Sequence, residues 1–247
     1  MITTHRAPDW DSYRMEYGDP HRILEPIESE IATVGKALSA LHRVGAIPST
    51  EYDPAKMLAF RRAVRELFEI PWSAITPRMQ RLLYAINAIV QPHNMIAAGV
   101  FCGYTFISNA GAAVGPGECY TAGNLIGVEV KPEEAMRAER NVRRIDPTGV
   151  AHVVAADAVD LVGRFAEPIS ILYLDADGGA TRGKGIYLDI LEAGYGRMPP
   201  GAVVLAHNSV NGGDPVKRYL EFVRDPAHFR ASVNVVFDIE GLEVSVK

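Results

Sequence analysis

The 247-residue sequence is poor in cysteine, in long apolar runs and in clustered basic residues. Its two cysteines, Cys102 and Cys119, lack C-x-x-C spacing, which argues against a disulfide framework and a zinc site. Neither an apolar signal segment nor a run of about eighteen apolar residues is present, so we expect a cytoplasmic protein without a membrane partner. A formal net charge of −5 without a long basic run disfavours a nucleic-acid partner. Small molecules are therefore the expected substrates.

The first 20 residues show no hydrophobic period but contain three aromatic side chains, Trp10, Tyr13 and Tyr17. Aromatic residues in a turn-rich segment need a surface to cover. We therefore expect an arm that packs on a second copy of the chain, giving a homodimer. A lid over the functional site is the alternative.

Three helices are expected before the first strand. Apolar residues recur at helical spacing from Ile23 to Leu41. Asp53-Pro54 and Thr76-Pro77 each combine an N-cap residue with proline at the first helical position, and an apolar stripe follows each pair. Residues 1–75 are thus predicted to form an N-terminal arm and helices.

From Asn94 onward, strands and helices alternate, which is typical of a parallel sheet covered on both faces. The last two β-rich runs, residues 232–237 and 242–246, are joined by a turn so short that they must pair antiparallel. The predicted fold is α/β: a Rossmann-like, seven-stranded mixed sheet with an antiparallel C-terminal hairpin and an N-terminal helical extension. Residues 76–247 would form the cofactor-binding domain.

The first strand–helix–strand unit, residues 95–129, indicates a nucleoside cofactor. Gly99 and Gly103 lie in its first turn, where glycine lets a ligand approach the backbone, and Glu129 closes its second strand, where an acid accepts hydrogen bonds from ribose hydroxyls. The unit lacks both the dinucleotide Gly-x-Gly-x-x-Gly spacing and a Lys-Ser/Thr phosphate pair. A nucleoside without pyrophosphate fits better, and S-adenosylmethionine is the commonest such cofactor.

Polar residues terminate consecutive strands of the predicted sheet, and in an open α/β sheet these ends meet in one crevice. They are Gly99, Glu129, Asp157, Asp175 with Asp177, and His207 with Asn208. Asp175, His207 and Asn208 offer donors for a divalent cation. Oxygen donors suit Mg²⁺, and imidazole favours Mn²⁺, Fe²⁺ or Zn²⁺. The alternative is that His207 lines the crevice without a metal.

From about Thr76 to its end, the chain resembles the metal-dependent class I O-methyltransferases of the caffeoyl-CoA and catechol type. Residues 76–83 look like the helix that leads into that family's cofactor site, residues 99–105 are similar to its Gly-x-x-x-Gly-Tyr-Ser/Thr loop, and residues 174–177 match its Val-Asp-Ala-Asp strand end. The resemblance implies that Asp175 and Asn208 ligate the cation. It also implies a set of cofactor-binding residues: Gly99, Gly103, Tyr104, Thr105, Glu129, Asp157, Ala158 and Asp175.

Three residues depart from the family pattern: Ala98 stands where an acid precedes the glycine loop, His207 replaces an aspartate, and Gly178 replaces a lysine that acts as general base. Lys184, Asp177 and His207 are the candidates to take the proton instead. We assign catalysis to Asp175, His207 and Lys184.

The expected function is S-adenosylmethionine-dependent O-methylation of a small aromatic or polyketide-like secondary metabolite, assisted by a divalent cation. One alternative keeps the fold and the cofactor but performs C- or N-methylation or a cyclisation in natural-product biosynthesis. Another alternative is a cofactor-binding module without activity.

Overall fold

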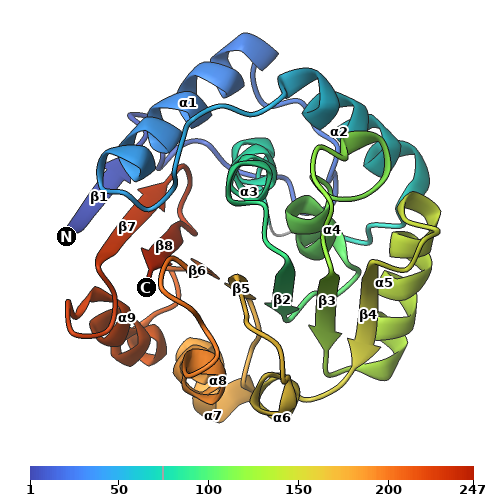
Figure 1. The fold of residues 1–247 in the computed structure, drawn as a ribbon. Coiled ribbons are helices and arrows are strands. Elements are labelled where there is room, and N and C mark those ends of the chain that lie inside the picture. The colour runs from blue at the N-terminus through green and yellow to red at the C-terminus, as the bar shows by residue number, and fades with distance from the viewer. Residues whose placement is uncertain (74) are drawn as a thin grey trace.

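The computed structural model describes residues 1–73 and 75–247, and these residues contain one eight-stranded sheet of order β1-β7-β8-β6-β5-β2-β3-β4 (Figure 1). The strands are β1 (Ile2–Arg6), β2 (Asn94–Ala98), β3 (Asn124–Glu129), β4 (Ala151–Ala155), β5 (Ile171–Leu174), β6 (Val203–His207), β7 (Ala231–Val236) and β8 (Leu242–Val246). Strand β8 runs antiparallel to β6 and β7, while all other pairs are parallel. The α/β class, the mixed sheet and the C-terminal hairpin are confirmed.

Helices cover both faces of the sheet. They are α1 (Ile27–Arg43), α2 (Pro54–Leu67), α3 (Pro77–Val90), α4 (Tyr104–Ala110), α5 (Pro132–Ile145), α6 (Ala158–Arg164), α7 (Gly179–Arg182), α8 (Ile186–Tyr195) and α9 (Lys217–Arg224), with 3-10 turns at Gly115–Gly117, Gly183–Gly185 and Asp214–Val216. One apolar cluster holds residues of α1 to α5, and the other holds residues of α6, α8 and α9, so the two groups lie on opposite faces (Figure 1). Among the described residues, the longest apolar helical stretch falls short of a membrane span.

The predicted helix caps are present. The Asp53 side chain accepts hydrogen bonds from the backbone amides of Ala55 and Lys56, and the Thr76 hydroxyl accepts one from Met79. Helix α1 begins four residues later than the apolar period suggests, at Ile27. Proline favours the start of a helix and biases the residue before it toward extended structure, so Pro26 fixes this boundary.

The prediction of seven strands is wrong by one, because residues 2–6 of the arm form strand β1, parallel to β7 at the sheet edge. In Figure 1 this N-terminal strand lies beside β7. Four of its five residues are exposed, so it is held by backbone hydrogen bonds rather than by a buried face. Because neither face of this edge strand is buried, its sequence does not alternate between apolar and polar residues, and the strand could not be predicted from that pattern.

The rest of the arm packs on its own chain through Arg78, at the start of α3. The Arg78 guanidinium donates to both carboxylate oxygens of Asp9 (2.8 and 2.9 Å) and of Glu25 (2.6 and 2.7 Å). It also lies 3.7 Å from the centre of the Tyr13 ring, which is buried. Because Tyr13 is buried against its own chain, it does not support an arm that packs on a second copy. The homodimer stays a prediction, which light scattering of the full chain checks.

Replacing Arg78 by methionine is expected to lower the free energy of unfolding by about 3 kcal/mol, because the Glu25 carboxylate, whose side chain is only 11% exposed, loses its partner. Urea unfolding measures the change, and limited proteolysis should show faster cleavage within residues 9–25. Arg14→Met is the matched control, since Arg14 is exposed and, among the described residues, its guanidinium donates hydrogen bonds only to the Asp11 carbonyl. Equal stability of the two variants would contradict the role of Arg78.

Candidate active site

The turn between β2 and α4 is a tight glycine loop with three residues in the left-handed region: Gly99 (φ +79°), Phe101 (φ +47°) and Gly103 (φ +87°). A Cβ atom on Gly99 would lie 2.4 Å from the backbone of Ala176, so only glycine lets this loop approach the end of β5. The loop therefore brings the first turn of α4 to the carboxyl edge of the sheet. This is the edge where the sequence places the cofactor.

Glu129, the last residue of β3, anchors this loop. One of its carboxylate oxygens accepts a hydrogen bond from the Phe101 amide (2.9 Å), and the other accepts one from the Lys131 amide (3.1 Å). Each oxygen has a further lone pair for a ligand hydroxyl. Glu129 is only 8% exposed, so it is held rigidly where the cofactor ribose is expected.

The remaining predicted cofactor residues lie at the starts of two helices, α6 and α4. Asp157 is exposed and caps α6 by accepting from the Asp160 amide, and the buried Ala158 follows it. Tyr104 and Thr105 form the first turn of α4 and are both buried. Burial raises the pKa of Tyr104 to about 12, and its side chain lines a cavity beside α2 and α3.

Asp175 forms the centre of the predicted catalytic set. Its Oδ1 atom lies 3.0 Å from Lys184 Nζ and 3.4 Å from His207 Nδ1, and its Oδ2 accepts a hydrogen bond from the Tyr173 hydroxyl (3.3 Å). Lys184 reaches it from the 3-10 turn before α8, and His207 ends the adjacent strand β6. Burial alone would raise the pKa of the Asp175 carboxyl, but the positive charges of His207 and Lys184 hold it below its usual value. The three residues assigned to catalysis are thus brought together.

The sequence did not predict Glu240, the acid on the other side of His207. Glu240 lies in the turn between β7 and β8, and its Oε2 stands 3.4 Å from His207 Nε2, in a geometry that makes no hydrogen bond. The Tyr17 hydroxyl of the arm donates to the other oxygen of Glu240 (3.2 Å). Burial alone would lower the pKa of His207, but the carboxylates of Asp175 and Glu240 raise it to about 10. His207 is therefore a cation at neutral pH, and it cannot accept a proton there.

The cluster does not fit the divalent cation that the sequence predicts. Both ring nitrogens of His207 face carboxylates, whereas a histidine ligand must be neutral. Lys184 Nζ already contacts the Oδ1 atom of Asp175 (3.0 Å). The side-chain amide nitrogen of Asn208 donates to Asn211 (2.9 Å), which leaves the Asn208 Oδ1 atom, within the described part of the chain, as the one uncommitted oxygen of the three predicted ligands. Among residues 1–73 and 75–247, no three His, Cys, Asp or Glu side chains are grouped to hold a metal ion. Lys184 and His207 supply the positive charge at Asp175 instead.

Asp177, the remaining candidate for the proton, does not join this cluster. Its carboxylate is exposed and accepts from the Gly179 amide (2.7 Å), so it caps the turn that leads to α7. Of the three candidates, only Lys184 and His207 contact Asp175.

Comparison with known proteins supports the family resemblance, although no protein-family model matches the chain. A catechol O-methyltransferase from Niastella koreensis is 24% identical over 166 residues, which cover 66% of this chain and 69% of that protein. The fold is shared with solved methyltransferases. An O-methyltransferase from Bacillus cereus, solved with S-adenosylhomocysteine, aligns with a TM-score of 0.55 and 19% identity, over 88% of this chain and all of the other.

A second solved structure leads to the same fold. It is an O-methyltransferase of tomaymycin synthesis from Streptomyces achromogenes, in complex with S-adenosylmethionine. It aligns with a TM-score of 0.54 and 20% identity, over 90% of this chain and 99% of that chain. The Rossmann-like methyltransferase fold predicted from the sequence is therefore confirmed.

Proposed function

We propose an activity for this chain on the premise that it is a class I methyltransferase, which its fold and its sequence resemblance to O-methyltransferases of the catechol type indicate. The protein transfers the methyl group of S-adenosylmethionine to an oxygen atom of a small-molecule acceptor. The observation that carries this proposal is the arrangement at one sheet edge. The glycine loop anchored on Glu129 lies against the residues that follow β5, and there Asp175 contacts Lys184 and His207.

The cofactor supplies an already activated methyl group, so the protein has to position it and the acceptor oxygen. Glu129 would bind the ribose hydroxyls with its free lone pairs, and Asp157 with Ala158 would border the adenine. The buried first turn of α4, with Thr105, would hold the methionine end.

Lys184 is the residue placed to activate the acceptor. Its ammonium group has three donors, of which two contact the carbonyl oxygen (3.1 Å) and the Oδ1 atom (3.0 Å) of Asp175. The third donor remains for an acceptor hydroxyl. A positive charge beside that hydroxyl lowers its pKa, so the hydroxyl proton passes to solvent and the oxyanion remains. The oxyanion then attacks the methyl carbon, and the cofactor sulfur leaves with the bonding electron pair as the neutral thioether of S-adenosylhomocysteine.

Glu129→Gln is expected to weaken S-adenosylhomocysteine binding by roughly tenfold or more, because hydrogen bonds to a charged acceptor contribute about 1.5–3 kcal/mol each. Isothermal titration calorimetry measures the affinity. Glu133→Gln removes the same charge from the exposed first turn of α5 and is the matched control. Unchanged affinity in Glu129→Gln would remove Glu129 from the cofactor site.

The activity itself is tested by incubating the protein with methyl-labelled S-adenosylmethionine and a panel of catechols and other phenols. The proposal expects label in the product on oxygen. Label on carbon or nitrogen would favour the alternative reaction types, and cofactor binding without turnover on any acceptor would favour a binding module.

A further inference from the structure

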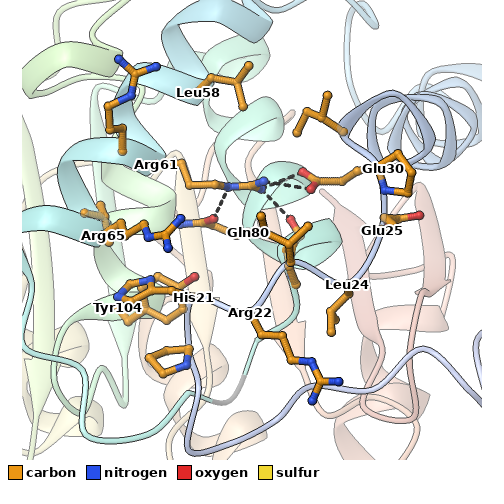
Figure 2. A pocket seen from close by; sticks show the side chains of 17 residues that line it. His21, Arg22, Leu24, Glu25, Glu30, Leu58, Arg61, Arg65, Gln80 and Tyr104 are labelled. Atoms are coloured by element: carbon orange, nitrogen blue, oxygen red, sulfur yellow. Dashed lines mark hydrogen bonds and ion pairs between the residues drawn. The ribbon is translucent and has the colours of Figure 1, made fainter.

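A cavity of about 420 Å³ lies between α2, the start of α3 and residues 20–27 (Figure 2), and its lining includes no residue of the Asp175 cluster. Its apolar wall includes Leu24, Leu58 and Val64. Tyr104 lines it as well, so one side of the cavity is the first turn of the cofactor-loop helix α4. A cavity of this size accommodates a small organic molecule.

Gln80, in the wall of this cavity, carries a hydrogen-bond donor without a partner. Its Oε1 atom accepts from Arg61 Nε (2.7 Å), which fixes the orientation of the amide. Its Nε2 group is buried, and within the described part of the chain it has no hydrogen-bond partner, although Gln80 is only 2% exposed. A buried donor without a partner costs about 1–3 kcal/mol, so a ligand acceptor at this position would be favourable.

The charged side chains that line the cavity leave a net positive charge. Both acids that line it are already paired: Glu25 binds Arg78, and Glu30 binds Arg61 and Arg81. Arg62 and Arg65 line the cavity without an ion pair among the residues that the structure describes. Figure 2 shows Arg65, Gln80 and Tyr104 around the same space.

The neighbouring titratable groups are consistent with this positive field. Burial and the positive charge of Arg65 hold the pKa of His21 below its usual value, so this lining residue adds no charge at neutral pH. The raised pKa of Tyr104 keeps its hydroxyl protonated and able to donate. The cavity thus combines an apolar wall with two neutral donors and two cations, Arg62 and Arg65, that form no ion pair among the described residues.

We propose that this cavity binds a small organic acid, with its carboxylate held by Gln80 Nε2, the Tyr104 hydroxyl and Arg65, and its apolar body against Leu24, Leu58 and Val64. The inference goes beyond methyl transfer and holds whatever the acceptor is. Because Tyr104 belongs to both the cavity and the first turn of α4, the bound acid adjoins the segment that carries the cofactor loop.

Ligand-observed NMR titrations of the full chain with benzoate, benzamide and inorganic phosphate test this proposal. We expect benzoate to bind in the millimolar range or tighter, and benzamide and phosphate to bind at least tenfold more weakly. Benzamide has the same shape without the charge, and phosphate has the charge without the apolar body. Failure of benzoate to bind the folded protein would overturn the proposal, as would preferential binding of phosphate or equal binding of benzamide.

Two variants locate the site. Gln80→Glu keeps the acceptor for Arg61 but replaces the free donor by a negative charge. Arg65→Ala removes the unpaired cation proposed to hold the carboxylate. Each variant should weaken benzoate binding tenfold or more. Arg218→Ala, on the exposed face of α9, removes the same charge outside the cavity and should change nothing. Arg65 is exposed, so its variant is expected to fold even if Gln80→Glu does not.

The same variants separate this site from the cofactor site. S-adenosylhomocysteine affinity of Arg65→Ala should stay within about threefold of the wild-type value. A loss of cofactor affinity as large as the loss of benzoate affinity would assign the cavity to the cofactor's own carboxylate and overturn a separate acid site.

Discussion

Lys184→Met is expected to lower kcat for methyl transfer by about 10²–10³-fold, the usual effect of removing a group that stabilises developing charge. The variant removes the ammonium group that contacts Asp175 and leaves the apolar side chain in place. Cofactor affinity should change little, because Glu129 and the glycine loop lie on other strands. Steady-state kinetics on the acceptor that the phenol panel identifies measures the loss, and calorimetry measures the cofactor affinity.

Lys184→Arg discriminates between charge and proton transfer. If Lys184 acts as a cation, arginine retains a substantial part of the rate; if it acts as a base, arginine is as inactive as methionine. Lys217→Met, which removes an exposed lysine paired with Asp214, is the matched control and should keep full activity. Wild-type kcat in Lys184→Met would remove this residue from the mechanism.

The stability of the protein should fall steeply between about pH 6.5 and pH 10 because of His207. Its pKa in the folded protein is raised to about 10, above the 6.5 of an unperturbed imidazole. The stabilisation by the Asp175 and Glu240 carboxylates is therefore fully present below pH 6.5, and it is lost as the pH rises through about 10. The loss is on the order of a few kcal/mol. Asp175, whose pKa is lowered, contributes stability above its ordinary value and loses it as the pH falls.

Urea unfolding at pH 6, 8 and 10 measures this effect against His207→Gln. The wild-type protein should lose far more stability than the variant over this range. His228→Gln, at a partly buried site near Asp225, is the control and should show the same dependence on pH as the wild-type protein. Parallel curves for the wild type and His207→Gln would show that His207 is not held as a cation.

The fold was predictable wherever burial on one face or on both faces of an element determined the pattern of apolar residues. Strands β2, β3 and β5 are fully or almost fully buried, and their continuous apolar runs indicated a parallel sheet. Strand β1 was missed because its exposed residues show no alternation. The start of α1 was placed too early because Ile23, which is exposed, happens to fit the helical spacing.

The candidate site was predictable to the extent that parallel strands end at one edge. Asp175 and His207 end neighbouring strands, so their meeting followed from the topology. Glu240 was missed because an acid in a hairpin turn is normally solvent-exposed, and only the packing of the sheet shows that this one is buried. The cation prediction rested on the chemistry of the donor side chains. Lys184 was assigned to the same catalytic set, but nothing in the residue pattern indicated that Glu240 would lie beside His207.

The central claim is that Lys184 and His207, rather than a divalent cation, provide the positive charge at the acceptor site. Its most direct test is the initial rate of methyl transfer in excess EDTA, with the metal content of the protein checked by elemental analysis. We predict the same rate with and without EDTA, and no increase on adding Mg²⁺, Mn²⁺ or Fe²⁺. Loss of activity in EDTA with full recovery on adding Mn²⁺ would contradict the claim and return Asp175, His207 and Asn208 to the role of metal ligands.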